Sequence, residues 1–279
     1  MIKTENLKRI VTAVLLAGVT VAGILFLETL LFAIAVGLIT AAAAWEWCLL
    51  GRGTVSLGWN IAFILLVGAG VPALLVFPPA LPWILGIALL WWISIAVLIA
   101  LGRRRSQAPG WQAKKWHTLL VIFPAAVAIT GLHATGSEGR WYVLACLLIV
   151  WTTDTCAYMV GRVCGKTLLA PGISPAKTVE GAGGGLVGAL IVGLILYETL
   201  PIEMIFPRLD WVVLAIVTAG FSVIGDLTES TYKRTAGVKD SGWILPGHGG
   251  ILDRIDSTFA SSPCSASSDS AWSVDSALS

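Results

Sequence analysis

Long apolar stretches separated by short polar breaks dominate the chain. A helix needs about 20 residues to cross the hydrocarbon core of a bilayer, and eight stretches come close to that length. They are residues 10–27, 29–50, 58–77, 81–101, 116–134, 140–160, 181–200 and 209–225. Because backbone polar groups in lipid must be satisfied within their own segment, each stretch is predicted to be a helix. The pattern therefore predicts an all-α fold, a polytopic integral membrane bundle of about eight transmembrane helices.

The composition supports this prediction. Hydrophobic residues make up 57% of the chain, charged residues only 12%, and the mean hydropathy is +0.86. A soluble domain carries roughly 25% charged residues, so a soluble globular protein is excluded. The first stretch has no small-residue cleavage site after it, which favours a retained span over a removed signal peptide. The five cysteines have no CxxC spacing, which favours reduced thiols over zinc ligands or disulfides.

The distribution of positive charge predicts an orientation. With the N-terminus in the cytoplasm, 16 of the 18 Lys and Arg residues fall on the cytosolic side, and only Arg140 and Arg208 fall outside. Positive residues concentrate in cytosolic loops of membrane proteins. We therefore expect a multi-pass protein of the cytoplasmic (inner) membrane, with a cytosolic N-terminus and with its polar loops on the cytosolic face.

Two polar clusters lie near the cytosolic ends of predicted spans. Asp154 lies inside the sixth span, where a carboxylate needs a cation, a metal ion or water. An ion pair with Arg162 or Lys166 is the structural alternative to a functional role. In the second cluster, Asp226 and Glu229 have the i, i+3 spacing that places them on one face of a helix. Both clusters are candidates for a site on the cytosolic face.

A third polar segment, residues 230–256, is denser in chemistry than any other and is called the signature segment below. It reads Ser-Thr-Tyr-Lys-Arg-Thr-Ala-Gly-Val-Lys-Asp-Ser-Gly-Trp-Ile-Leu-Pro-Gly-His-Gly-Gly-Ile-Leu-Asp-Arg-Ile-Asp. It resembles the signature of the phosphatidate cytidylyltransferase (CDP-diacylglycerol synthase) family, which contains the same Lys-Arg, Lys-Asp, His-Gly-Gly and Asp-Arg-x-Asp elements. The match departs at Tyr232, where an aliphatic residue or Phe is usual. The stretch from Ser174 to Glu180 is similar to another segment of that family, so motifs support the resemblance from about Asp154 to Asp256.

The resemblance implies an enzyme of phospholipid biosynthesis. CTP and phosphatidate would be its substrates, CDP-diacylglycerol and pyrophosphate its products, and the lipid bilayer its surroundings. Hard oxygen ligands without thiolates or a histidine cluster select Mg²⁺ or Mn²⁺, and two ions are expected. No nucleic-acid partner is expected, and a homodimer stays an open alternative.

Site residues follow from the same resemblance. Those expected to hold metal are Asp226, Asp253, Asp154 and Glu229. Those expected to act in catalysis are Asp226, Asp253, Lys239, Asp240, His248 and Arg254. Those expected to bind substrate are Ser174, Lys177, Glu180, Lys233, Arg234, Gly249 and Gly250. Because the attacking phosphate is already an anion, His248 is expected to donate a hydrogen bond and not to act as a base. Glycines let backbone amides come close to phosphate oxygens.

Two other classes of membrane protein are alternatives to this enzyme. A polyprenol or phytol kinase would use similar nucleotide chemistry, but the complete signature favours the cytidylyltransferase. An anion transporter would be expected to show inverted repeats, which the sequence lacks. The glycine run from Gly181 to Gly185 is predicted to allow close helix packing, and the segment 161–167 is one residue short of a P-loop. Glu46 is expected to snorkel or to pair helices.

Three regions are expected along the chain. Residues 1–135 would form N-terminal membrane helices, and residues 136–257 the catalytic membrane region with its cytosolic loops. Residues 258–279 are rich in serine and are predicted to be disordered. The family signature is usually followed by a last apolar helix. A ninth span is therefore expected to be missing here, through truncation or a change of reading frame just after Ser257.

Overall fold

The computed structural model describes residues 2–51, 57–101, 114–201, 207–242, 249–256, 258 and 261. Within these ranges the helices are α1 (Ile2–Phe26), α2 (Thr29–Leu50), α3 (Leu57–Ala73), α4 (Leu81–Ala100), α5 (Thr118–Val121), α6 (Phe123–Ala134), α7 (Ser137–Cys164), α8 (Val179–Thr199) and α9 (Arg208–Thr235). Short 3₁₀ turns, Pro78–Ala80 and Lys115–His117, precede α4 and α5. The strands β1 (Leu168–Ala170) and β2 (Ser174–Thr178) form an antiparallel pair.

The helices confirm the predicted all-α bundle, and they follow the predicted spans in order. Among the described residues, five helical segments are long and apolar enough to cross a membrane. They are Thr29–Leu50, Pro78–Ala100, Ser137–Cys164, Val179–Thr199 and Arg208–Thr235. Three further apolar helices, at Val11–Phe26, Leu57–Ala73 and Thr118–Ala134, are shorter. The eight expected spans thus appear as eight apolar helical segments, five of which meet the length requirement.

Two helices continue past the apolar stretches that predicted them. α7 ends at Cys164 and α9 at Thr235, whereas apolarity ends near residues 160 and 225. The expected loop at 161–180 also contains the β1–β2 hairpin, with Leu168 opposite Thr178. Polar residues that a hydropathy profile assigns to loops therefore lie on ordered backbone beyond the ends of the spans.

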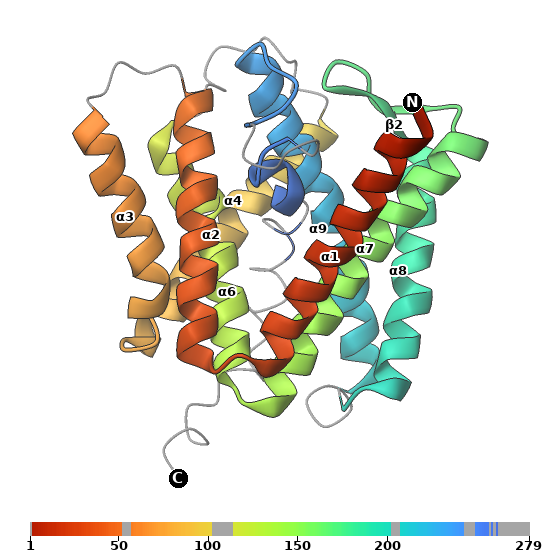
Figure 1. Ribbon diagram of the computed structural model, residues 1–279. Helices are drawn as coiled ribbons and strands as arrows, with labels where there is room; N and C mark the ends of the chain where they lie inside the picture. Colours follow the sequence, from red (N-terminus) through yellow and green to blue (C-terminus); the bar gives the residue numbers. More distant parts are fainter. Residues whose placement is uncertain are drawn as a thin grey trace.

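Glycines bring α7 and α8 into close contact. A Cβ atom on Gly185 would lie 2.8 Å from the carbonyl oxygen of Thr153, and one on Gly181 would lie 2.8 Å from that of Ala157. The two helices lie side by side in Figure 1. The prediction that the glycine run allows close helix packing is confirmed, since no larger residue fits at these positions without displacing a helix.

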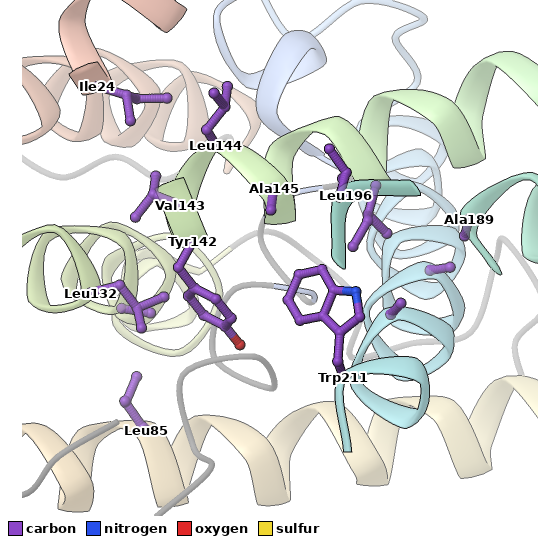
Figure 2. Close-up of a cluster of buried hydrophobic side chains, with 14 of the residues drawn as sticks. Ile24, Leu85, Leu132, Tyr142, Val143, Leu144, Ala145, Ala189, Leu196 and Trp211 are labelled. Carbon is purple, nitrogen blue, oxygen red and sulfur yellow. The ribbon is translucent and has the colours of Figure 1, made fainter. Parts of the chain in front are cut away.

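A buried apolar cluster fills the centre of the bundle. Figure 2 shows Tyr142 of α7 beside Trp211 of α9, and their ring centroids lie 5.8 Å apart. The Trp211 indole donates a hydrogen bond of 2.7 Å to the carbonyl oxygen of Gly193 in α8. Leu85 and Leu132 bring α4 and α6 to the same cluster. This core holds α7, α8 and α9 together, and the predicted site residues lie on these three helices and on the segments that follow α7 and α9.

The ends of the helices place the polar segments together. The N-terminal end of α1 lies at the same end of the bundle as β2 and the end of α9 (Figure 1). This shared end is called the polar end below. The opposite end carries the ion pair between Glu198 and Arg208, whose Oε1 and Nη2 atoms lie 3.0 Å apart. That the polar end faces the cytosol stays a prediction from the charge distribution.

Cysteine labelling tests this orientation. On a background without the five native cysteines, Lys239→Cys and Glu198→Cys place one thiol at each end of the bundle. An impermeant maleimide should label Lys239→Cys only from the cytosolic side and Glu198→Cys only from the outside. Labelling of both positions from the same side would contradict the arrangement of the helices.

Alanine substitutions test the glycine contact. Gly185→Ala should destabilise the protein by about 1–3 kcal/mol, because the new methyl group overpacks the interface against the backbone of Thr153. A methyl group on Gly183, by contrast, meets nothing within 4 Å, so Gly183→Ala should stabilise the helix by about 0.5–1 kcal/mol. Thermal unfolding in detergent measures both changes. Shifts of the same sign would contradict the interface described here.

Candidate active site

The last turns of α9 carry a row of charged side chains on one face. Asp226, Glu229 and Lys233 follow one another at helical spacing. The Ser230 hydroxyl donates to Asp226 Oδ1 at 3.4 Å, and Lys233 Nζ lies 2.6 Å from Glu229 Oε2. The Glu229 side chain is only 1% exposed. The extension of α9 beyond the apolar stretch thus presents a nearly buried ion pair at the polar end.

Lys233 also binds the later part of the signature segment. Its Nζ atom donates to Asp253 Oδ1 at 2.8 Å, and the two side chains are 14% and 6% exposed. One ammonium group therefore joins two carboxylates that lie on different parts of the chain. This contact brings Asp253 against α9, although the two residues are 20 positions apart.

Asp253 organises the backbone around it. Both of its carboxylate oxygens accept a hydrogen bond from the Ser241 amide, at 3.2 and 3.1 Å, and Oδ2 also accepts from the Gly250 amide at 2.9 Å. Burial by itself would raise the pKa of Asp253, but the hydrogen bonds from Lys233, Gly250 and Ser241 outweigh it and lower the pKa. Asp253 is therefore a carboxylate at neutral pH.

Gly249 completes this turn. It has a φ of +81°, and a Cβ atom there would lie 2.7 Å from Asp253 Oδ2. Both the backbone conformation and the close approach of the carboxylate require glycine at this position. The expected contact of the Gly249 and Gly250 amides with substrate stays a prediction, and in this structure the Gly250 amide points to Asp253.

The β1–β2 hairpin is fastened to the same end of α9. Lys177 on β2 forms a salt bridge with Asp226, and Arg234 Nε donates to the carbonyl oxygen of Ile173 at 3.5 Å. At the start of α8, the Glu180 carboxylate accepts hydrogen bonds from the amides of Lys166 and Thr167 at 3.1–3.2 Å. These contacts close the segment between α7 and α8 over the end of α9.

Several predicted site residues have exposed side chains. Lys239, Asp240 and Arg254 are exposed and close to this cluster in sequence, and a Cβ atom on Gly249 would lie 3.7 Å from that of Asp240. Ser174 begins β2, and Asp154 is exposed on α7, ten residues before that helix ends. His248 lies outside the described residues. The structure thus brings together Lys177, Asp226, Glu229, Lys233, Arg234, Asp253 and the glycine turn, and the roles assigned to all these residues stay predictions.

The carboxylates differ in how well they fit a metal ion. No group of three or more His, Cys, Asp or Glu residues in the described ranges is arranged to hold one. Glu229 and Asp253 already share Lys233, and Asp253 is further occupied by backbone amides. Asp226 is also paired with a lysine, Lys177, but its side chain is 28% exposed, and Mg²⁺ is commonly held by one or two carboxylates together with substrate phosphates. Asp226 therefore fits a metal shared with substrate, whereas Asp253 and Glu229 do not fit one in this arrangement.

Glu46 is the residue whose place the sequence did not reveal. It was expected to snorkel or to pair helices, but its side chain is fully buried and faces the signature segment. The prediction of snorkelling is wrong. One feature of the sequence could have indicated its role: an ionisable residue within a membrane span is a functional candidate by default.

An aromatic cluster beside Glu46 packs α2 against α9. Trp47 lies against Tyr232, with ring centroids 4.7 Å apart, and its indole donates to the carbonyl oxygen of Lys114 at 3.1 Å. His117 lies 5.4 Å from the same tyrosine ring. Tyr232, the one departure from the family signature, is thus a packing residue with a fully buried side chain.

Two residues of the serine-rich tail are described, and both are helical. Thr258 and Ser261 line a small cavity between α6 and α7, next to Leu132, Val143 and Cys146. Ser261 is 1% exposed. At these two positions the tail is packed against the bundle. The prediction of disorder for the remainder of 258–279 falls on residues outside the described ranges.

Fold and site together define a class: a polytopic membrane protein with a cluster of acidic and basic side chains at one end of its helices. The chain belongs to the cytidylyltransferase family, whose family model matches residues 7–268. The match takes in the N-terminal helices, for which hydropathy was the only support in the sequence. It also continues past Ser257, the point at which a change of reading frame was expected.

Three similar proteins carry the name phosphatidate cytidylyltransferase. The phosphatidate cytidylyltransferase of Pseudomonas aeruginosa is 34% identical over 260 residues, which cover 92% of this chain and 94% of that protein. The enzyme of the same name from Haemophilus influenzae is also 34% identical, over 92% of this chain and 96% of its own length. That of Staphylococcus saprophyticus is 49% identical over about half of each chain.

The shared lysine generates a stability prediction. Lys233→Met leaves Glu229 and Asp253 without their common cation and should destabilise the protein by about 3–5 kcal/mol. Arg254→Met, at an exposed position, should change stability by no more than about 0.5 kcal/mol. Adding Glu229→Gln to Lys233→Met should recover part of the loss, because it removes an unpaired charge. Equal thermal stability of Lys233→Met and Arg254→Met in detergent would show that the pair is not structural.

Proposed function

We propose that this protein is a phosphatidate cytidylyltransferase, which converts CTP and phosphatidate into CDP-diacylglycerol and pyrophosphate. Membership of the cytidylyltransferase family and the names of relatives that match more than nine-tenths of the chain support this function. The observation that carries it is the assembly of the signature motifs at the end of α9, where Lys233 binds Asp253 and Asp226 binds Lys177 of the β1–β2 hairpin.

In the proposed reaction, an oxygen of the phosphatidate phosphate attacks the α-phosphorus of CTP. The bond from that phosphorus to the β-phosphate oxygen breaks, and pyrophosphate leaves with the electron pair. Two polyanions must approach each other, and negative charge grows on the leaving group, so positioned cations supply most of the stabilisation. The exposed Lys239 and Arg254 are suited to meet phosphates, and the phosphate nucleophile needs no general base.

A divalent cation, Mg²⁺ or Mn²⁺, would neutralise phosphate charge in this reaction. Asp226 is the residue that would hold it, together with oxygens of the substrate. Lys177, now paired with Asp226, would then be released to bind a phosphate. A second ion, expected from the resemblance, stays a prediction, because Asp253 and Glu229, two of its expected ligands, are bound to Lys233.

The proposal places the polar end at the cytosolic face of the cytoplasmic membrane. The positive charges favour that side, and CTP is a water-soluble substrate that must reach the site from an aqueous compartment. The acyl chains of phosphatidate would stay in the bilayer beside the helices. A homodimer stays an open alternative.

An assay of pyrophosphate release tests the function. Purified protein in detergent, given CTP, phosphatidate and Mg²⁺, should release pyrophosphate and form CDP-diacylglycerol in equal amounts. A lipid kinase would instead transfer the γ-phosphate of a nucleotide to a polyprenol and release no pyrophosphate, and a transporter would do neither. Absence of pyrophosphate release with phosphatidate would refute the proposal.

Substitution of Asp226 tests the metal assignment. Asp226→Asn should lower turnover by about 10²-fold or more, because it removes charge stabilisation at the reacting phosphates. Asp210→Asn, an exposed position at the other end of the same helix, is the matched control and should keep full activity. EDTA should silence the parent enzyme, with Mg²⁺ or Mn²⁺ restoring it and Zn²⁺ not. Activity of Asp226→Asn within about threefold of the parent would rule out its metal role.

A further inference from the structure

Glu46 makes a set of contacts that joins the second helix to the signature segment. Its Oε1 accepts a hydrogen bond from the Ile251 amide at 3.0 Å. Its Oε2 accepts from the Leu252 amide at 2.8 Å and from the Ser241 hydroxyl at 3.1 Å. The donors lie 195 to 206 positions away in sequence. Both carboxyl oxygens are therefore used to hold backbone and side-chain donors of one distant segment.

The surrounding glycines show how tightly this carboxyl group is enclosed. A Cβ atom on Gly250 would lie 2.3 Å from Glu46 Oε2, and one on Gly242 would lie 2.5 Å from Oε1. Neither position can carry a larger residue while Glu46 stays in place. Two glycines of the signature segment are thus fitted to a side chain that comes from α2.

The donors held by Glu46 are neighbours of residues with predicted roles. Ser241 follows Lys239 and Asp240, and Leu252 precedes Asp253 and Arg254. The Ser241 amide also donates to Asp253. Glu46 from outside the segment and Asp253 from within it therefore hold the same two stretches, 241–242 and 250–252. The exposed side chains of Lys239 and Arg254 lie at the outer edges of these stretches.

A carboxyl group inside an apolar helix is not needed for packing. Burial of an acidic side chain within a membrane helix is unfavourable, and such residues generally face a polar partner with a function. Its neighbour Trp47 already provides the apolar contact between α2 and α9 through Tyr232. What Glu46 adds is that it fixes the amides of Ile251 and Leu252, and with them the segments that carry Lys239 and Arg254.

We propose that Glu46 is a positioning residue, which fixes the two stretches of the signature segment so that Lys239 and Arg254 meet the substrate phosphates. This inference rests on the proposed function. It assigns to the N-terminal helices a direct part in building the site, although the motifs of the site all lie after residue 150.

The experiment compares Glu46→Gln with the parent protein in detergent. Glutamine keeps the size of the side chain, but its NH₂ group cannot accept a hydrogen bond, so at least one held donor is lost. Loss of one such bond to a charged group corresponds to about tenfold in an equilibrium. We expect kcat/KM per folded molecule to fall about tenfold, with a higher KM for CTP. We also expect trypsin to cleave after Lys239 and Arg254 about tenfold faster, while cleavage after Lys166 keeps its rate.

Glu28→Gln is the matched control, because Glu28 is exposed at the other end of α2 and its side chain does not cap the helix. It should resemble the parent in both measurements. If Glu46→Gln does not fold, Ser241→Ala replaces it, since it removes a single donor. A simple loss of folded protein would lower Vmax and leave KM unchanged. Rates expressed per folded molecule therefore separate that loss from a defect in positioning the site.

Changes of less than about threefold in kcat/KM would overturn the proposal, and so would faster cleavage without any kinetic change. If the parent protein releases no pyrophosphate from CTP and phosphatidate, the proposed function fails separately. The cleavage rates then decide alone whether Glu46 holds the segment. Faster cleavage at Lys239 and Arg254 upholds that role, and unchanged cleavage refutes it.

Discussion

The ion pairs of Lys233 are the contacts on which the polar end of the molecule depends. Glu229 is almost completely buried, and a buried carboxylate is stable only with a partner close by. Lys233 supplies that partner from the next turn of α9 and at the same time fixes Asp253. Asp253 in turn fixes the amides of Ser241 and Gly250, which donate hydrogen bonds to its carboxylate. Loss of this one cation would leave two buried carboxylates without their shared partner and would remove one of the contacts that hold the segment between them.

The opposite end of the bundle uses polar contacts in a similar way. Apolar side chains pack against lipid about as well as against each other, so polar contacts and small residues must specify how membrane helices associate. His133 Nε2 lies 3.0 Å from the carbonyl oxygen of Ile24, and Arg140 Nη1 donates to that of Leu25 at 3.1 Å. These bonds satisfy carbonyl groups at the end of α1. Each end of the bundle is thus fastened by side chains that bind the backbone of another segment of the chain.

Hydropathy predicted the helices well because lipid imposes a simple rule on every span. The eight apolar stretches all correspond to helical segments, but their ends could not be read in the same way. The last turns of α9 are polar, and only the spacing of Asp226 and Glu229 indicated that the helix continues. The β1–β2 hairpin is short and has no apolar alternation to reveal it.

The site was predicted in part, and the limit has a physical reason. The charged residues on α9 and the hairpin are brought together as the signature suggested, since the resemblance marked each of them. Glu46 was not recognised, because its partners lie about 200 positions away and no local pattern links them. Asp253 was recognised as important, but its hydrogen bonds to backbone amides depend on a turn that sequence does not display.

The glycine contact between α7 and α8 also limits how the bundle can open. Where two helices contact each other through their backbones, no side chain can rotate to open a passage between them. A passage between them would require both helices to move apart as rigid bodies, against the core formed by Tyr142 and Trp211. The interface between α7 and α8 is therefore closed to a substrate that enters from the bilayer. A lipid substrate is therefore expected to enter from the bilayer between other helices.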